Sequence, residues 1–221
     1  MKVARARLLA GRYPQSAEAL LFVAAGYELV GNSQPAFGDV QGLAELLVAG
    51  LGGVAPQPLR GVVPDVVSYF GQPDPYAPSS VYARLALEAW ARHTPLQMTD
   101  AVPNECPRCR HAPQLGVLRQ SGNGDALFLG CSLCRTEWAF RRTTCPECLE
   151  TDPEKIQYHT AEGWPQVRTQ TCESCRGYLH LLLPEVEPGM IPDVDELALL
   201  PLDVWAMDQG YHKVWPNLAG V

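Results

Sequence analysis

The sequence contains no long apolar run, no excess of basic charge and no cysteine before Cys106. Its longest strongly apolar run, Ala19 to Ala25, is far shorter than the roughly 20 residues that a membrane-spanning helix needs. Lys2, Arg5 and Arg7 are followed by mixed sequence and not by the apolar segment of a secretory signal. We therefore expect a cytoplasmic protein that does not insert into membranes.

The formal net charge of −7 is unevenly distributed along the chain. Basic and acidic side chains nearly balance over residues 1–104 and balance over residues 105–180, whereas residues 181–221 hold one basic and seven acidic side chains. Broad nucleic-acid binding needs a basic face that neutralises phosphates. The neutral middle and the acidic end therefore argue against a nucleic-acid partner.

Motifs of catalysis are also missing. The chain has no nucleophile elbow, no phosphate-binding loop and no catalytic carboxylate pair, so we do not expect an enzyme. Trp138, Phe140 and Trp164 are expected in small cores, with a platform for stacking bases as the alternative. The histidines show no mutual ligand spacing, so structural or surface positions are expected for His93, His111, His159, His180 and His212.

Residues 1–100 read as a helical domain. Apolar positions at helical spacing predict helices over residues 17–30, 40–51 and 80–93, and a short one within residues 62–70. Ser16, Asp39 and either Ser79 or Ser80 are the expected N-caps. Glycine, proline and cysteine replace this pattern further on, which places the domain boundary near Met98 to Asn104.

All eight cysteines lie in four Cys-x-x-Cys pairs, a spacing that random placement would not give. Structural disulfides are not expected in a reducing compartment. Four thiolates in a tetrahedron hold one structural metal ion, iron or zinc, so four pairs predict two metal sites. A thioredoxin-type redox pair would need a βαβ setting, which is absent. The expected metal ligands are Cys106, Cys109, Cys131, Cys134, Cys145, Cys148, Cys172 and Cys175.

The pairs could combine in a nested, an interleaved or a sequential order, and the connecting segments favour the sequential one. Hairpins are expected over residues 114–130 and 155–170, and each brings the next pair back beside the one before it. A third strand follows each time, at residues 136–140 and 177–183. The chain is thus expected to be α+β, with two tandem rubredoxin-like or zinc-ribbon modules over residues 101–142 and 143–184.

Only ten residues, Arg135 to Thr144, separate the second pair from the third. We therefore expect the two modules to pack as one unit. Arg108, Arg110, Arg135 and Arg176 stand inside or directly after the pairs, where they either offset the charge of metal–thiolate sites or are solvated surface residues.

Residues 185–221 form an acidic segment with a predicted helix over residues 192–215. Pro201 lies inside that pattern and should kink or split the helix. The helix is expected to fold back on the helical domain or to cover the cysteine-rich one.

The stretches CPRC, CSLCRTEWAFRRTTCPEC and TCESCRGYL resemble the formate dehydrogenase accessory protein (FdhE) family. The resemblance is densest from Cys106 to Leu181, and it extends more loosely to both ends of the chain. It implies a helical domain followed by two rubredoxin-like modules, each binding iron through four cysteines. It also implies a cytoplasmic accessory protein that binds the catalytic subunit of formate dehydrogenase and supports its assembly or activation.

One feature departs from rubredoxins, whose metal-binding turns prefer glycine directly after the second cysteine, where φ can be positive. Arg110, Arg135, Leu149 and Arg176 occupy these positions, so we expect departures from rubredoxin geometry. An electron-transfer protein and, further off, a nucleic-acid-binding zinc ribbon are the alternative functions. The surface for the partner is expected between the helical domain and the modules, because domain junctions make clefts.

Overall fold

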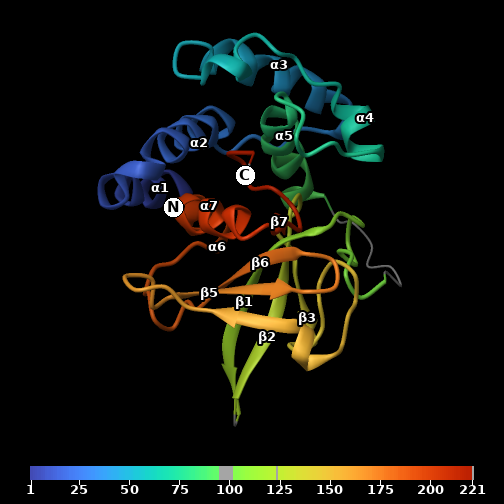
Figure 1. Ribbon diagram of the computed structural model, residues 1–221. Helices are drawn as coiled ribbons and strands as arrows, with labels where there is room; N and C mark the ends of the chain where they lie inside the picture. Colours follow the sequence, from blue (N-terminus) through green and yellow to red (C-terminus); the bar gives the residue numbers. More distant parts are fainter. Residues whose placement is uncertain (95–101, 123, 221) are drawn as a thin grey trace.

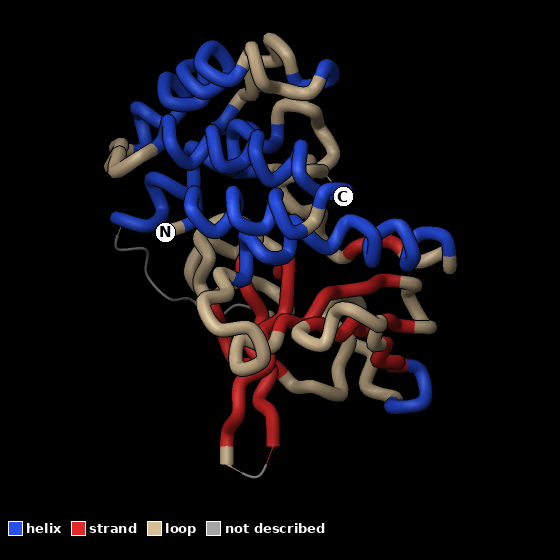
Figure 2. Tube along the Cα trace, turned by 90° about the vertical axis from the view of Figure 1, so that its left-hand side faces the viewer, coloured by secondary structure: helices blue, strands red, loops and turns tan. Residues whose placement is uncertain are grey.

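A computed structural model describes residues 1–94, 102–122 and 124–220. Its helices form a layer above a twisted sheet, and the last helices lie between the two (Figures 1 and 2). The amino-terminal helices are α1 (Lys2–Arg12), α2 (Ala17–Val30), α3 (Val40–Leu51), α4 (Val66–Gly71) and α5 (Ser80–His93). The predicted α+β class is confirmed.

The starts of α2, α3 and α5 agree with the sequence prediction, and the predicted residues Ser16, Asp39 and Ser79 occupy the N-cap positions, but without the expected side-chain cap hydrogen bonds. Neither Ser16 nor Asp39 makes a side-chain cap hydrogen bond, because a 3-10 turn precedes each helix and already turns the chain. The Ser16 hydroxyl donates instead to the carbonyl of Ala198, at 2.9 Å. It therefore fastens the helical layer to the carboxyl-terminal segment. Asp65, which was not predicted as a cap, accepts from the Ser68 amide at the start of α4.

Helix α5 is buried on all sides from Ser80 to Ala91 because it runs between the other helices and the sheet (Figure 1). A helix in that position is expected to be apolar all round. Two charged residues, Arg84 and Glu88, are nevertheless buried in it, each only 1% exposed. Both make contacts with the cysteine-rich part of the chain, as described below.

The six main strands form one continuous sheet in the order β3-β2-β1-β6-β5-β4. The first module supplies β1 (Pro113–Ser121), β2 (Gly124–Cys131) and β3 (Glu137–Phe140), and the second supplies β4 (Ile156–His159), β5 (Val167–Cys172) and β6 (Gly177–Leu182). The modules join where β1 and β6 pair in parallel. This pairing confirms that they pack as one unit.

Gly116 makes the junction of β1 and β6 possible. It pairs with Leu181, and a Cβ atom at this position would clash with the side chains of Leu181 and Leu127. The absence of a side chain lets the two modules approach closely at the centre of the sheet.

The carboxyl-terminal segment splits as predicted, but it is shorter as a helix than predicted. It comprises α6 (Pro192–Asp195), the 3-10 turn η5 (Glu196–Leu199) and α7 (Leu200–Asp208), with Pro201 in the first turn of α7. The predicted helix to residue 215 is wrong beyond Asp208. Gly210 has a φ of 80°, which turns the chain so that β7 (His212–Lys213) pairs with β6.

The segment satisfies both predicted placements at once, since it contacts α1 and α2 on one side and lies against the sheet on the other (Figure 1). None of the helices among the described residues is long and apolar enough to cross a membrane. The division of the chain at residues 100, 142 and 184 stays a prediction, and residues 98–101 of the first predicted boundary lie outside the described residues.

Candidate metal centres

The residue after the second cysteine of each pair has a positive φ, the conformation for which a rubredoxin turn prefers glycine. Their φ angles are 66° at Arg110, 58° at Arg135, 62° at Leu149 and 63° at Arg176. These are the non-glycine residues with positive φ in the part of the chain that the structure describes. The turns therefore keep a positive φ without glycine, at a cost of about 1–2 kcal/mol per residue, while a departure from rubredoxin geometry in other respects stays a prediction.

The first cluster, called site one below, joins the first two pairs. The four sulfur atoms all lie within 4.8 Å of one another; the Cys106–Cys134, Cys109–Cys131 and Cys109–Cys134 sulfur pairs are 3.3 to 3.6 Å apart. A disulfide would require about 2.05 Å. A metal with sulfur ligands at about 2.3 Å has sulfur–sulfur edges of roughly 3.8 Å, so the spacing is close to a metal tetrahedron. Site one consists of Cys106, Cys109, Cys131 and Cys134.

The second cluster, site two, joins the last two pairs, which makes the order sequential. Cys145 and Cys175 have their sulfurs 3.7 Å apart, and Cys148 and Cys172 have theirs 3.8 Å apart. These distances match the edges of a metal–thiolate tetrahedron. Site two consists of Cys145, Cys148, Cys172 and Cys175.

Backbone amides point at the sulfurs in both sites. The amides of Leu133 and Cys134 donate to the Cys131 sulfur at 3.3 and 3.4 Å, and the Glu147 amide donates to the Cys145 sulfur at 3.4 Å. Such bonds stabilise thiolates. They are the local reason why two residues suffice between the cysteines of a pair.

The crowded sulfurs cannot all ionise by themselves. Burial raises the pKa of Cys131 well above its usual value, and burial also raises the pKa of Cys145 to about 12. Hydrogen bonds from Cys106 and Cys109 lower the pKa of Cys134 instead. A divalent cation at the centre would stabilise four thiolates together, so the donor set fits a tetrahedral metal ion.

The two sites differ in their surroundings. Cys106, Cys131 and Cys134 belong to the main hydrophobic core, which also contains the residues of the amino-terminal helices. Site two has a small core of its own around Ile156, and Cys148 is exposed. Site one thus lies at the contact between helices and sheet, and site two lies near the surface.

Arg135 connects site one to the helices and is neither a surface residue nor simply a counter-charge for sulfur. Its Nε lies 3.2 Å from Glu88 and 3.6 Å from Asp193, and its Nη1 donates to Gln114 at 2.9 Å. Lys2 lies 2.6 Å from the other oxygen of Glu88. Burial raises the pKa of Glu88, but the charges of Arg135 and Lys2 outweigh it and lower it to about 2.

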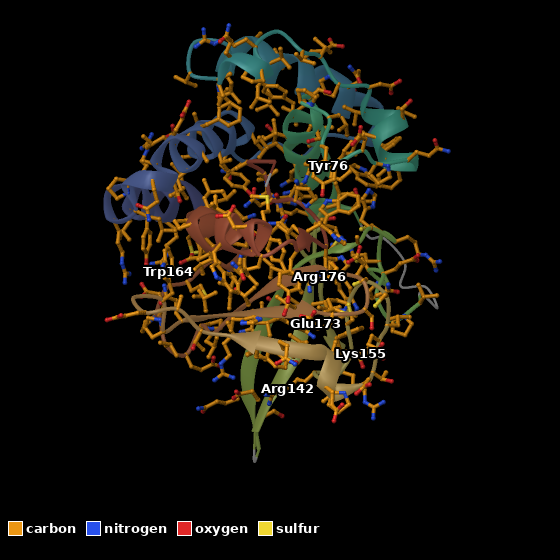
Figure 3. The ribbon with its side chains drawn as sticks, viewed as in Figure 1. Tyr76, Arg142, Lys155, Trp164, Glu173 and Arg176 are labelled. Carbon is orange, nitrogen blue, oxygen red and sulfur yellow. The ribbon has the colours of Figure 1, made fainter. Side chains whose placement is uncertain are left out.

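The other three arginines are also held by oxygen atoms. Arg108 donates to the carbonyls of residues 91 and 94, both at 2.6 Å, and Arg110 pairs with Glu105 at 2.8 Å. Arg176 pairs with Glu173 at 2.6 Å and donates to the carbonyl of Gln209 at 2.7 Å (Figure 3). The side chains of Arg110 and Arg176 are exposed, which fits the expectation of solvated surface arginines.

Sequence reasoning missed a buried charge cluster beneath β6. His180, Glu196 and Asp203 place their ligand atoms within 4.8 Å of one another. The ammonium group of Lys213 pairs with both carboxylates, at 2.8 Å from Asp203, so a cation already balances their charge. His180 donates from its Nε2 to Asp203 Oδ1 at 2.8 Å, which is a structural role. In the sequence, the only sign of this buried cluster is that its charged residues stand singly among apolar neighbours.

Sequence reasoning also missed the buried role of Arg84, and it found only one of the two surroundings of Trp164, which packs against the small cluster of Val117, Val167 and Leu182 as expected but also against the main core. Arg84 donates from α5 to the carbonyls of Pro216 and Asn217, at 2.9 and 2.8 Å, and so holds the carboxyl-terminal segment. Trp164 in addition stacks on Tyr13, with ring centroids 4.5 Å apart. It packs the second module against the helical layer, because the loop before β5 reaches the turn after α1.

A cavity of about 420 Å³ lies at the predicted junction. Phe70 of α4, Cys109 of site one, Glu147 of site two and Trp215 are among the residues that line it. The junction therefore contains a cleft that touches the metal-binding turns of both sites.

Comparison with known proteins gives matches along most of the chain. A family model described as "FdhE, central domain" matches residues 105–142, and one described as "FdhE, C-terminal domain" matches residues 143–219. A protein named "Protein FdhE homolog" from Aquifex aeolicus is 30% identical over 118 residues, 53% of this chain and 42% of that protein. Another of that name from Stutzerimonas stutzeri is 40% identical over 115 residues, 51% of this chain and 37% of that protein.

The chain thus spans about two fifths of the length of these curated relatives. The crystal structure of the FdhE protein from Pseudomonas aeruginosa matches with a TM-score of 0.68 at 23% identity, covering 98% of this chain and 93% of that one. This likeness shows a shared fold. Because the two family models together match more than half of the sequence, the chain belongs to the FdhE family.

Proposed function

We propose that this protein is a cytoplasmic, non-catalytic accessory protein that binds the catalytic subunit of a formate dehydrogenase and supports its assembly or activation. The observation that carries the proposal is the pair of four-sulfur centres, built into one sheet, in a member of the FdhE family. The family's name, and the accessory role that the resemblance implies, supply the client.

The eight cysteines are proposed as ligands of two metal ions. Four thiolates accept iron and zinc alike, and iron is favoured by the family resemblance. When bound, the metal would crosslink the turns of each module and stabilise a fold of few buried residues. The chain's own residues contribute the positioned sulfurs and the amides that donate to them.

The junction cavity is a proposed contact for a loop or side chain of the client. It is lined by turns of both sites and by α4, so a group bound there would touch the two modules and the helical layer together. Its volume suits a few side chains and not a whole element of structure.

Co-purification from the native cell tests the proposed function. The wild-type protein should capture a formate dehydrogenase catalytic subunit, identified by mass, and the double variant Cys145→Ala/Cys148→Ala should lose that capture. Preparation without oxygen followed by air oxidation should give a red protein if the metal is iron. Absence of the catalytic subunit from the wild-type sample would contradict the proposed function. A colourless protein with stoichiometric zinc would show that the bound metal is zinc and not iron.

Electron transfer is a second candidate, favoured by the exposure of Cys148 at site two. An exposed ligand shortens the path between a metal centre and a redox partner. A reversible ferric–ferrous couple over repeated cycles would support this role. Loss of iron during a single cycle would exclude it.

A further inference from the structure

Two leucines on the outer side of the helical layer are exposed and adjoin each other through α3. Leu46 of α3 is 69% exposed and Leu29 of α2 is 50% exposed. A Cβ atom on Gly50 would lie 2.7 Å from Leu29, which shows that the Leu29 side chain lies directly on the α3 backbone. Gly50 and Leu46 are one turn apart on α3. The two leucines therefore belong to one apolar surface.

A shallow groove of about 770 Å³ continues this surface along α3. It is lined by the loop at residues 33–35 and by Gly38, Asp39, Gly42, Leu43 and Leu46. An added Cβ on Gly42 would meet no atom within 4 Å, so packing inside the chain does not require glycine there. Gly42, Leu46 and Gly50 follow each other at intervals of four residues, the spacing at which a second helix can pack closely on the first.

The chain segment that forms the groove carries charges of one sign only. Residues 13–59 contain no lysine, arginine or histidine, but four acidic side chains. All four, Glu18, Glu28, Asp39 and Glu45, are exposed, and Arg7 of α1 pairs with Glu28 at 2.7 Å. Asp39 lines the groove itself, and Glu45 stands beside Leu46. An apolar surface with an acidic border fits an apolar segment with basic flanks.

We propose that this α3 groove binds a helical segment of a partner protein that carries an apolar stripe with lysine or arginine beside it. The stripe covers Leu29 and Leu46, and the basic groups face Asp39 and Glu45. A second copy of the same face would set carboxylates against carboxylates, and an anionic membrane would repel them. That the partner is the catalytic subunit rests on the proposed function. The preference of the groove for an apolar helix with basic flanks does not depend on it.

The first test uses two labelled model peptides that form amphipathic helices, one of leucine and lysine and one of leucine and glutamate, with fluorescence anisotropy as the measurement. The lysine peptide should bind the wild-type protein and the glutamate peptide should not. Gly42→Gln, which fills the groove, and Leu46→Glu should each weaken binding at least tenfold. Glu45→Lys should weaken it several-fold.

Matched controls separate the groove from general charge and from folding. Leu8→Glu changes a leucine of α1 that is 57% exposed, and Glu162→Lys changes an exposed carboxylate of the second module; both should leave binding unchanged. Gly42→Gln should keep or raise the melting temperature, because glutamine favours the helix. Equal binding by wild type and the groove variants, or equal binding of both peptides, would overturn the proposal.

The second test uses the catalytic subunit and separates the two proposals. If the wild type captures it and Gly42→Gln does so tenfold more weakly, the groove is one of its binding sites, beside the proposed contact at the junction cavity. If both capture it equally, the groove inference fails and the proposed function stands. If neither captures it but the peptide result holds, the proposed function fails and the groove stands. Self-association abolished by Leu46→Glu, or binding to anionic phospholipid vesicles, would assign another occupant and overturn the inference.

Discussion

Site one and site two have the same four sulfurs and the same turn geometry, yet they hold different parts of the molecule together. Site one lies in the main core, and Arg135, directly after its last cysteine, enters a buried ion cluster with Glu88 and Lys2. Site two has a small core, and Arg176, in the corresponding position, is 41% exposed. If each site binds a metal ion as proposed, the surroundings of the turns, and not their local geometry, would decide which part of the molecule that ion stabilises.

The largest expected effect comes from removing each site in turn. Cys131→Ala/Cys134→Ala should unfold the helical layer together with the first module, because these cysteines pack in the core that the helices share. Cys145→Ala/Cys148→Ala should unfold the second module and leave helices α2, α3 and α5 protected. Hydrogen exchange read by mass spectrometry distinguishes the two patterns. Equal loss of protection in the helices of both variants would break the comparison.

Arg135 and Arg176 give the next effect. Arg135→Met leaves Glu88 buried with fewer cations, and breaking a buried pair in this way costs about 3–5 kcal/mol. Arg176→Met removes an exposed pair with Glu173, which is worth less than about 1 kcal/mol. Urea unfolding of the metal-loaded variants gives both values. Similar losses would show that the site-one cluster contributes no more than a surface pair.

The pH dependence of stability also distinguishes the two sites, through the buried carboxylate of Glu88. The pKa of Glu88 is lowered from 4.5 to about 2 in the folded protein. The contribution of Glu88 to the free energy of unfolding is therefore complete above about pH 4.5 and is lost as the pH falls toward 2. The lost stability is roughly 3 kcal/mol. The pKa of Glu150 near site two is also lowered, mainly by the hydrogen bond that it accepts from the Ser174 hydroxyl. This carboxylate is exposed to solvent, so its effect on stability is screened.

The measurement is the stability of wild type, Glu88→Gln and Glu150→Gln across this pH range. Metal content is followed alongside stability for all three proteins, and their curves are compared at pH values where the metal content is equal, so that the differences report the carboxylates. The difference between wild type and Glu88→Gln should shrink as the pH falls, whereas Glu150→Gln should stay nearly parallel to wild type. A constant offset for Glu88→Gln would contradict the role assigned to the buried carboxylate.

The smallest effect concerns the strained turns. Leu149 at site two has a φ of 62° with an exposed side chain, so Leu149→Gly should stabilise the protein by about 0.5–1 kcal/mol. Arg135→Gly relieves the same strain at site one but removes the pairs with Glu88, and should destabilise the protein. Urea midpoints measure both signs. Stabilisation in both variants would show that Arg135 does little beyond its backbone.

Much of this architecture could be predicted from local pattern. The strands between cysteine pairs and the limits of α2, α3 and α5 follow from periodicity and turn residues, and the sequential order of the pairs follows from the hairpins. These features depend on neighbours in the chain. The retained positive φ at Arg110 or Leu149 could not be predicted, because residue preference alone opposes it.

What the sequence could not show depends on distant partners. The placement of Arg84 and Arg135 depends on acceptors and carboxylates far away in the sequence, such as the carbonyl of Pro216 and the side chain of Glu88. The parallel pairing of β1 with β6 likewise joins segments that no short pattern relates. The end of α7 was misjudged because β7 gains strand pairing with β6.

Native mass spectrometry during chelation tests the unequal roles of the two sites most directly. The protein should begin with two metal ions per chain and pass through a species with one, because the exposed Cys148 gives a chelator access to site two while site one lies in the core. That intermediate should keep hydrogen-exchange protection around Cys131 and Cys134 and lose it around Cys145 and Cys148. Direct passage from two metals to none, or a species that loses site one first, would contradict the account.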